Sequence, residues 1–236
     1  MIKQILNATA LAVFSFATPS VAQDSNPVVI ELYTSQGCSS CPPADALLKE
    51  YADRDDVITL ALHVDYWDYI GWADTLARPE HADRQRGYAA AAHKRTIYTP
   101  QMVLNGEDHV VGSHPDELAD GIKRHQARAE QVSLDVERDG DTLQIRARNI
   151  AYETSAGEVE LLIVRYTPEE TVEIQRGENA GKRISYGSIV TGIDVLTRWN
   201  AQEDLTFSTD GIQDGPLVVL VQKANYGSVL AAARLR

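Results

Sequence analysis

The sequence predicts an α/β protein: a central mixed sheet flanked by helices, followed by an antiparallel, β-rich domain. Two observations support this fold class. Segments typical of buried strands alternate with segments of helical spacing as far as about residue 130. Beyond that point, short strand-like segments follow one another with turn residues between them. We therefore predict one domain over residues 23–130 and a second, sandwich-like domain over residues 131–236.

The first domain is predicted to run strand, helix, strand, helix, strand, strand, helix. Val28–Tyr33 and Val57–Val64 are apolar and rich in β-branched residues, which favours buried strands. Pro42–Tyr51 begins with prolines, which suit a first helical turn, and its apolar residues have helical spacing. The other predicted elements are a helix over Glu80–His93, a hairpin of Met102–Leu104 and His109–Val111 around Asn105-Gly106, and an amphipathic helix over Pro115–Arg128.

The second domain shows alternating or apolar segments separated by turn residues such as Asp139-Gly140. This pattern is typical of antiparallel strands. The predicted strands are Val132–Val136, Leu143–Ala147, Val159–Tyr166, Val172–Gln175, Leu205–Ser208, Leu217–Lys223 and Val229–Arg234. The segment Glu178–Lys182 lacks the spacing of a phosphate-binding loop and is interpreted as a turn.

The N-terminus has the features of a secretory signal peptide. A basic start at Lys3 precedes the apolar run Ile5–Phe16, and small residues lead to a cleavage site after Ala22. That run is too short to span a bilayer. We expect residues 1–22 to be removed and the protein to be exported, periplasmic or secreted, with no membrane insertion afterwards. Disulfides persist in such compartments.

The charge of the chain limits its partners. The 236 residues carry a formal net charge of −12 at pH 7. Nucleic acids and anionic membranes both require a basic surface patch, so neither is an expected partner.

Cys38 and Cys41 are the only two cysteines, and they lie in the sequence Cys-Ser-Ser-Cys. A pair this close closes only a small loop, so it would stabilise the fold little as a structural bridge. Cys38 lies between a predicted strand and a predicted helix, where the helix dipole favours the reactive thiolate. Cys41 is placed one turn into the helix, where its sulfur can resolve a mixed disulfide. The pattern predicts an attacking thiol and its resolving partner.

Three motifs carry a resemblance to a known superfamily: Gly37-Cys-Ser-Ser-Cys-Pro42, Tyr98-Thr-Pro-Gln101 and Val110-Val-Gly-Ser-His114. Over residues 27–130 the chain resembles the thioredoxin-like superfamily. The motifs Cys38-Ser-Ser-Cys-Pro-Pro-Ala-Asp45, His63-Val-Asp-Tyr-Trp-Asp68 and Tyr98-Thr-Pro-Gln101 are similar to those of exported thioredoxin-like proteins grouped as a domain of unknown function. That similarity covers most of the chain and implies no particular substrate.

The resemblance implies roles for individual residues. Cys38 would be the nucleophile, Cys41 the resolving thiol, and Pro100 a cis proline that faces the pair and, with the Thr99 backbone, aligns a substrate strand. Glu31 nearly matches a buried acid that moves protons for the resolving cysteine. Buried there, its carboxylate would have a raised pKa and act as a general base. The alternative is a strand carboxylate that faces solvent.

An aromatic segment follows the second strand and is expected on the cysteine edge of the sheet. Its members, together with a tyrosine before Pro100, form either a wall of the substrate groove or a packed loop. These residues are Tyr66, Trp67, Trp72 and Tyr98.

We therefore predict a periplasmic thiol-disulfide oxidoreductase without a cofactor beyond its own redox-active disulfide, acting on thiol or disulfide clients with an unidentified redox partner. One alternative is a copper-binding or copper-delivery protein that uses Cys38, Cys41 and His63, because His63 ends a neighbouring parallel strand. Another is a scaffold with a non-catalytic binding role, since fold does not determine function.

Overall fold

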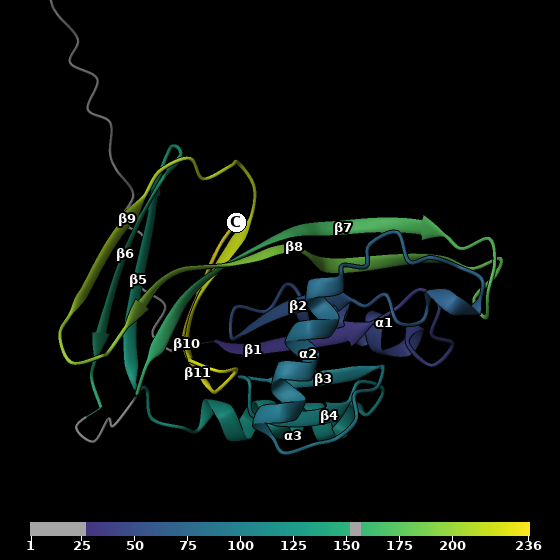
Figure 1. Ribbon diagram of the computed structural model, residues 1–236, viewed down its shortest axis with the longest axis horizontal. Coiled ribbons are helices and arrows are strands. Elements are labelled where there is room, and N and C mark those ends of the chain that lie inside the picture. Colours follow the sequence, from purple (N-terminus) through teal and green to yellow (C-terminus); the bar gives the residue numbers. More distant parts are fainter. Residues whose placement is uncertain (1–26, 152–156) are drawn as a thin grey trace, which may run out of the picture.

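The computed structural model describes residues 27–151 and 157–236, so the predicted signal peptide lies outside the described residues. Within them, a large eight-stranded sheet has the strand order β11-β10-β7-β8-β2-β1-β3-β4, and a smaller sheet has the order β5-β6-β9 (Figure 1). The strands are β1 (Val28–Thr34), β2 (Val57–His63), β3 (Gln101–Leu104), β4 (Asp108–Val111), β5 (Val132–Asp139), β6 (Thr142–Asn149), β7 (Val159–Glu173), β8 (Arg183–Trp199), β9 (Leu205–Thr209), β10 (Leu217–Lys223) and β11 (Val229–Leu235). The α-helices are α1 (Pro42–Tyr51), α2 (Pro79–Ala91) and α3 (Pro115–Gln126), and Asp68–Ile70 forms a short 3₁₀ turn.

The large sheet is mixed and is built from both parts of the chain. β1 pairs with β2 in parallel and with β3 antiparallel. β8 lies beside β2 in parallel at Ala61 and Ile189, and β7, β10 and β11 continue the sheet from there. The protein thus has a mixed α/β fold with a large, mostly strand-built sheet and few helices. The sheet continues across residue 131, and the predicted domain boundary there stays a prediction.

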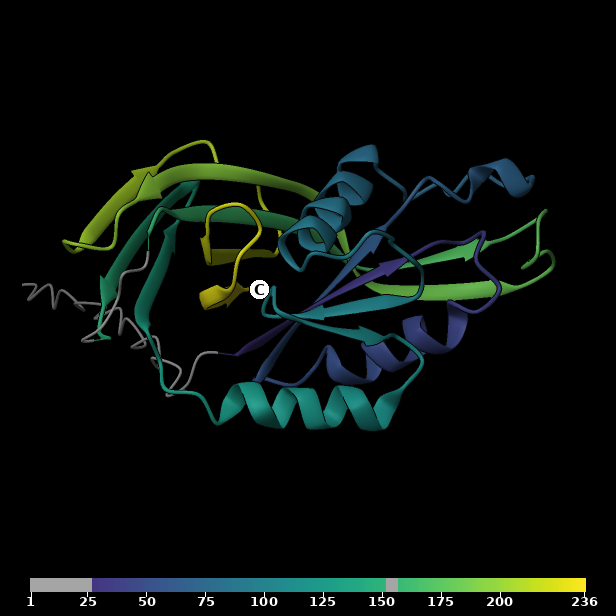
Figure 2. The same cartoon turned by 60° about the horizontal axis from the view of Figure 1, so that its bottom comes forward.

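Helices cover both faces of the β1–β4 region of the sheet (Figure 2). Successive strand residues point to opposite faces. Ile30 and Leu32 of β1 accordingly pack in the cluster formed with α1 and α3. Val29 and Tyr33 pack in the cluster that includes α2. β1 is buried along its whole length because it is covered from both sides.

The same alternation places the smaller sheet. Leu162 and Val164 of β7 belong to the cluster on the α2 face. The alternate residues of β7, Leu161 and Ile163, point to the other face and pack with Leu143 and Ile145 of β6. The smaller sheet therefore covers the β7–β10 end of the large sheet on the face opposite that cluster.

The main difference from the predicted elements is the hairpin β7–β8. The two predicted strands Val159–Tyr166 and Val172–Gln175 belong to a single strand, β7, which ends at Glu173. The strand β8 was not predicted. Gly187 and Gly192 interrupt the apolar pattern of β8. Because they have no side chain, Lys49 packs closely against Gly187 and Arg165 packs closely against Gly192. Glycine weakens the local strand signal, so the tertiary contacts decide this element.

In the described part of the chain, no helix has the length and apolar character needed to cross a membrane.

Candidate active site

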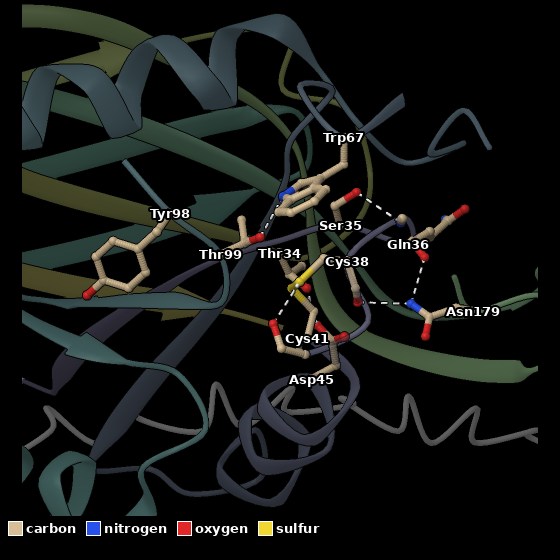
Figure 3. The surroundings of a disulfide bond; sticks show 12 residues. Thr34, Ser35, Gln36, Cys38, Cys41, Asp45, Trp67, Tyr98, Thr99 and Asn179 are labelled. Atoms are coloured by element: carbon tan, nitrogen blue, oxygen red, sulfur yellow. Dashed lines mark hydrogen bonds between the residues drawn. A yellow bond between two sulfur atoms is a disulfide. The ribbon is translucent and has the colours of Figure 1, made fainter. Parts of the chain in front are cut away.

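Cys38 and Cys41 form a disulfide at the start of α1, with an S–S distance of 2.14 Å (Figure 3). Both lie in a turn, because the Cys38 amide donates to the Ser35 carbonyl and the Cys41 amide donates to the Cys38 carbonyl. Cys41 is the N-cap residue and the helix begins at Pro42, so the prediction that Cys41 lies one turn into the helix is wrong. The Cys41 carbonyl accepts hydrogen bonds from the first free helical amides, those of Ala44 and Asp45.

Both cysteines are nearly inaccessible in this oxidised form. The exposed fraction is 1% for Cys38 and 0% for Cys41. The two residues between them, Ser39 and Ser40, are exposed. The Ser40 hydroxyl lies 3.4 Å from the Cys38 sulfur. An incoming thiol must therefore approach from the side of the two serines or displace a covering side chain.

The Thr99–Pro100 peptide bond is cis, as predicted. The Pro100 loop and the start of α1 converge at Gly112. A Cβ atom at that position would lie 3.0 Å from the Cβ atoms of both Ala44 and Pro100, so only glycine lets the loop approach the helix this closely. The Gly112 amide also donates to the Pro100 carbonyl. The cis proline is thereby placed beside the helix turn that carries the disulfide.

The predicted aromatic residues contribute differently. Trp67 packs against the loop that carries the disulfide. Its Cβ lies so close to Gly37 that a Cβ added at Gly37 would be 3.2 Å from it, and its indole Nε1 donates to Thr99 Oγ1 at 2.7 Å. Trp67 therefore contacts both the residue before Cys38 and the residue before Pro100, and its hydrogen bond to Thr99 is drawn in Figure 3. Trp72 Nε1 donates to the Gln36 side chain at 2.7 Å, and the Tyr66 hydroxyl donates to Gln85.

Tyr98 and Tyr69 complete the aromatic surroundings. Tyr98 is half-buried, and its carbonyl accepts a hydrogen bond from Gln85. Tyr69, which was not predicted as a site residue, is 80% exposed and its ring is stacked parallel to that of Trp67. An exposed aromatic ring on the outer side of Trp67 extends this surface toward solvent.

Glu31 lies on the opposite face of the sheet from the cysteines. Its carboxylate is buried against α2, where Arg84 donates two hydrogen bonds of 2.7 and 2.8 Å and the Tyr88 and Tyr33 hydroxyls also donate. Burial alone would raise the pKa of Glu31, but the positive charge of Arg84 and these hydrogen bonds lower it overall. The predicted raised pKa is wrong, and so is the alternative of a solvent-facing carboxylate.

Asp45 is a buried carboxyl group on the cysteine side of the sheet, and sequence reasoning missed it. It lies in the first turn of α1, one turn after Cys41, and its Oδ1 accepts a 2.7 Å hydrogen bond from Thr34. Its Oδ2 is buried with no hydrogen-bond partner. Burial raises the pKa of Asp45 to about 7, although nearby His63 opposes this shift. The available signal was an acid at the helical position that faces the sheet.

His63 lies beside Asp45 on the same face, because it pairs in register with Thr34 on the neighbouring strand. Its Nδ1 is 2.8 Å from Asp74 Oδ2, and its ring meets Tyr186 edge-on. A carboxylate only accepts, so this contact assigns the Nδ1 proton to His63. His63 Nε2 and the Tyr186 hydroxyl are buried and lack hydrogen-bond partners, like Asp45 Oδ2. Asp45, His63 and Tyr186 therefore form a buried polar cluster.

The geometry gives no support to the copper alternative. Among the described residues, no group of three or more His, Cys, Asp or Glu side chains is placed to hold a metal ion. His63 Nδ1 is already committed to Asp74, and the two sulfurs are bonded to each other.

Residues 29–222 match the family described as protein of unknown function (DUF1223). The chain belongs to this family. A crystal structure of protein AGR_C_4864 from Agrobacterium tumefaciens is similar, with 32% identity, a TM-score of 0.77, and coverage of 91% of this chain and 96% of that one. HBP35 of Porphyromonas gingivalis shares the fold at 16% identity and a TM-score of 0.57, over 91% of this chain and 76% of that one. No curated protein matches the sequence.

In this DUF1223 protein the second part of the chain also reaches the site. Asn179, in the loop between β7 and β8, is fully buried, and its Nδ2 donates to the carbonyls of Gln36 and Cys38. Sequence reasoning interpreted Glu178–Lys182 as a turn and assigned Asn179 no role in the site. The turn itself is present, but a single asparagine in a turn carries no sign of a partner far away in the sequence.

Proposed function

We propose that this DUF1223 protein is a thiol-disulfide oxidoreductase with a thioredoxin-like arrangement around Cys38 and Cys41. The observation that carries the proposal is the position of the disulfide. It lies at the N-terminus of α1, beside the cis Thr99–Pro100 bond. The positive end of the helix dipole favours a thiolate at that position, and the thiolate is the form that exchanges.

The exchange follows from the order of the two sulfurs. A substrate thiolate attacks Cys38 Sγ, the Cys38–Cys41 bond breaks, and Cys41 leaves as a thiolate that takes up a proton. A second substrate thiolate then attacks the substrate sulfur of the mixed disulfide and releases Cys38. Two substrate thiols become one disulfide, and two electrons and two protons pass to the cysteine pair. The reverse sequence reduces a substrate disulfide.

Cys38 is assigned as the attacked sulfur because its Sγ lies 3.4 Å from the hydroxyl of the exposed Ser40, whereas Cys41 caps the helix and has an exposed fraction of 0%. The Thr99 backbone and Pro100 are proposed to align an extended substrate segment. Tyr66, Trp67, Trp72 and Tyr98 are proposed to border its groove. Trp67 is proposed to cover the sulfurs between turnovers, since its hydrogen bond to Thr99 joins the two sides of the site.

The proposed setting is the exported, periplasmic or secreted environment, where a signal peptide over residues 1–22 would deliver the chain. The proposed partners are proteins with thiols or disulfides and a redox partner that resets the pair. The formal net charge of −12 gives no support to a nucleic-acid partner.

One observation favours a second candidate, a binding scaffold with a structural disulfide. The exposed fractions of 1% and 0% are typical of a buried, unreactive bridge. The redox midpoint separates the two candidates, because structural disulfides resist reduction by glutathione.

The deciding experiment is the redox equilibrium of the purified protein. It is poised in glutathione buffers, its free thiols are trapped by alkylation, and they are counted by mass. The proposal expects a midpoint between about −120 and −270 mV, the range of working dithiol catalysts. A pair that stays oxidised below about −300 mV contradicts the proposal and favours the scaffold.

Two single-cysteine variants provide a control for the assigned roles. Cys41→Ser leaves only the attacking sulfur and should accumulate mixed disulfides with added small disulfides. Cys38→Ser leaves only the helix-capping sulfur and should accumulate few. Equal trapping by both variants would contradict the assignment of Cys38 as the exchanging residue.

A further inference from the structure

The hairpin β7–β8 extends well beyond the strand next to it. β10 pairs with β7 only over Val159–Arg165, whereas β7 and β8 pair with each other as far as Glu173 and Arg183. We call the part of the hairpin from Thr167 to Ile189 the arm. It runs past β2 and α1, and its tip lies at the end of α1 that carries the disulfide (Figure 1).

The arm is fastened to the sheet and to α1 along its length. Ser188 hydrogen-bonds Thr59 of β2 at 2.9 Å, in the buried interior. Lys49 of α1 donates to Glu169 and to Ser185, one residue on each strand of the arm. The tip is therefore held at a fixed distance from the disulfide.

At the tip, Asn179 contacts the loop that leads into the disulfide. Its side-chain amide donates both hydrogens, to the Gln36 carbonyl and to the Cys38 carbonyl, each at 2.9 Å. Its Oδ1 accepts a 2.7 Å hydrogen bond from Lys182. A flipped amide would point its oxygen at two carbonyls and its hydrogens at an ammonium group, so this orientation is the one that satisfies every atom.

The loop is held from the other side as well. The Gln36 amide donates to Asp74, and the Gln36 side chain accepts from Trp72. Among the residues that the structure describes, the Cys38 carbonyl accepts hydrogen bonds only from the Cys41 amide and from Asn179. Asn179 is thus the contact from outside the disulfide turn that fixes the Cys38 peptide group.

We propose that Asn179 is a positioning residue for the redox pair: it holds the Cys38 backbone where its sulfur meets that of Cys41. This inference deepens the proposed dithiol-disulfide function and rests on it. The second part of the chain thereby takes part in the chemistry of the first.

The expected effect is on the balance between the two oxidation states. Oxidation joins the two sulfurs and transfers two electrons and two protons to an external disulfide, which leaves as two thiols. A loop already fixed next to Cys41 loses little conformational freedom in that step. Without Asn179 the reduced loop can relax away from Cys41, so the dithiol gains entropy that the disulfide does not. Disulfide formation becomes less favourable.

The experiment compares Asn179→Ala with the natural protein. Each is equilibrated in glutathione buffers and in dithiothreitol buffers, which reach more reducing conditions, and free thiols are trapped and counted by mass. We expect the equilibrium constant for disulfide formation to fall at least tenfold, a midpoint about 30 mV less negative. The control is Glu178→Gln, an exposed neighbour at the same tip, which should leave the midpoint unchanged.

A variant with the natural midpoint overturns the inference, since a purely structural asparagine stabilises the oxidised and reduced forms alike. If Asn179→Ala does not fold, Asn179→Ser, which retains one donor, is measured in its place and judged by the same criterion. The two proposals fail separately. A natural midpoint below about −300 mV contradicts the oxidoreductase, while the ratio between variant and natural protein in dithiothreitol still decides the role of Asn179.

Discussion

Asp45, one turn after Cys41, is buried, whereas Glu50, the other acid of α1, is exposed. Thr34 satisfies one of its oxygens, and the other has no hydrogen-bond partner. A carboxyl group in this position is better stabilised when it carries a proton, and its pKa of about 7 expresses that preference. Asp45, and not Glu31, is therefore the buried acid whose pKa is raised, and it lies on the cysteine side of the sheet.

Asp45 is expected to make stability depend on pH. Between its ordinary pKa of 3.8 and the folded value of about 7, the folded protein holds a proton that the unfolded chain releases. The resulting stabilisation is complete at low pH and is lost as the pH rises through 7. The measurement is urea unfolding of the oxidised protein at several pH values. Its free energy of unfolding should fall by about 3 kcal/mol more between pH 4.5 and 8 than that of Asp45→Asn, which cannot ionise. Parallel pH profiles of the two proteins would rule out this role.

At the scale of elements, α2 is attached to the sheet by one buried ion pair. Arg84 bonds Glu31 of β1 and also Gln222 of β10, so a single side chain joins the helix to two strands. Removing one partner of a buried pair leaves the other charge without compensation.

We expect Arg84→Ala to reduce the free energy of unfolding by about 3–5 kcal/mol. The double variant Glu31→Ala/Arg84→Ala should cost less than the sum of the single changes, because no unpaired charge remains. Urea unfolding of the four proteins measures this coupling. Arg86→Ala breaks an exposed ion pair with Asp83 on the same helix and should cost about 0–1 kcal/mol. Additive effects of the two buried changes would show that the pair is not coupled.

The segment between β2 and α2 carries Trp67, whose hydrogen bond to Thr99 joins the two sides of the site. Thr99→Val keeps the shape of the side chain but removes the acceptor. We expect the disulfide to be reduced severalfold faster by dithiothreitol, with its midpoint unchanged, because the indole leaves the sulfurs more often. The reduction rate is followed by alkylation and mass. Thr96→Val, an exposed threonine three residues earlier, is the matched control, and an unaltered rate in Thr99→Val would contradict the covering role.

The sequence predicts elements well where the local pattern and the packing agree. β1, α1, β2 and the cis proline are found at or near their predicted positions, because uninterrupted apolar runs and prolines are local signals. β8 was missed because its glycines serve contacts with Lys49 and Arg165, which are distant in the sequence. The pKa of Glu31 was predicted in the wrong direction because Arg84, 53 residues away, could not be placed beside it. Asp45 and Asn179 were missed for the same reason: their partners are not neighbours in the chain.

For the whole molecule, the decisive feature is that one sheet contains strands from both predicted domains. β2 has β1 on one side and β8 on the other. The cluster on the α2 face combines residues of β1 and β2 with Leu162, Val218 and Leu220 from the later strands. Separating the two parts would expose this apolar surface to water.

A chain that ends at residue 130 is therefore expected to lack cooperative folding. It would lose β8, which pairs with β2. It would also lose the residues that the later strands contribute to the cluster on the α2 face, and the hydrogen bond between Arg84 and Gln222. Circular dichroism and urea unfolding of this fragment, with the full protein as reference, provide the measurement. A cooperative transition with the same midpoint as the full protein would support an independent domain over residues 23–130.

The contact of Asn179 with Cys38 also sets an order of maturation. The two residues are 141 positions apart, and a chain is synthesised from its N-terminus. Both cysteines are therefore present, and free to meet any oxidant, long before the residue that fixes their loop has left the ribosome. The two cysteines are therefore first present without this restraint, and the hydrogen bond from Asn179 to the Cys38 carbonyl can form only after the last third of the chain has begun to emerge.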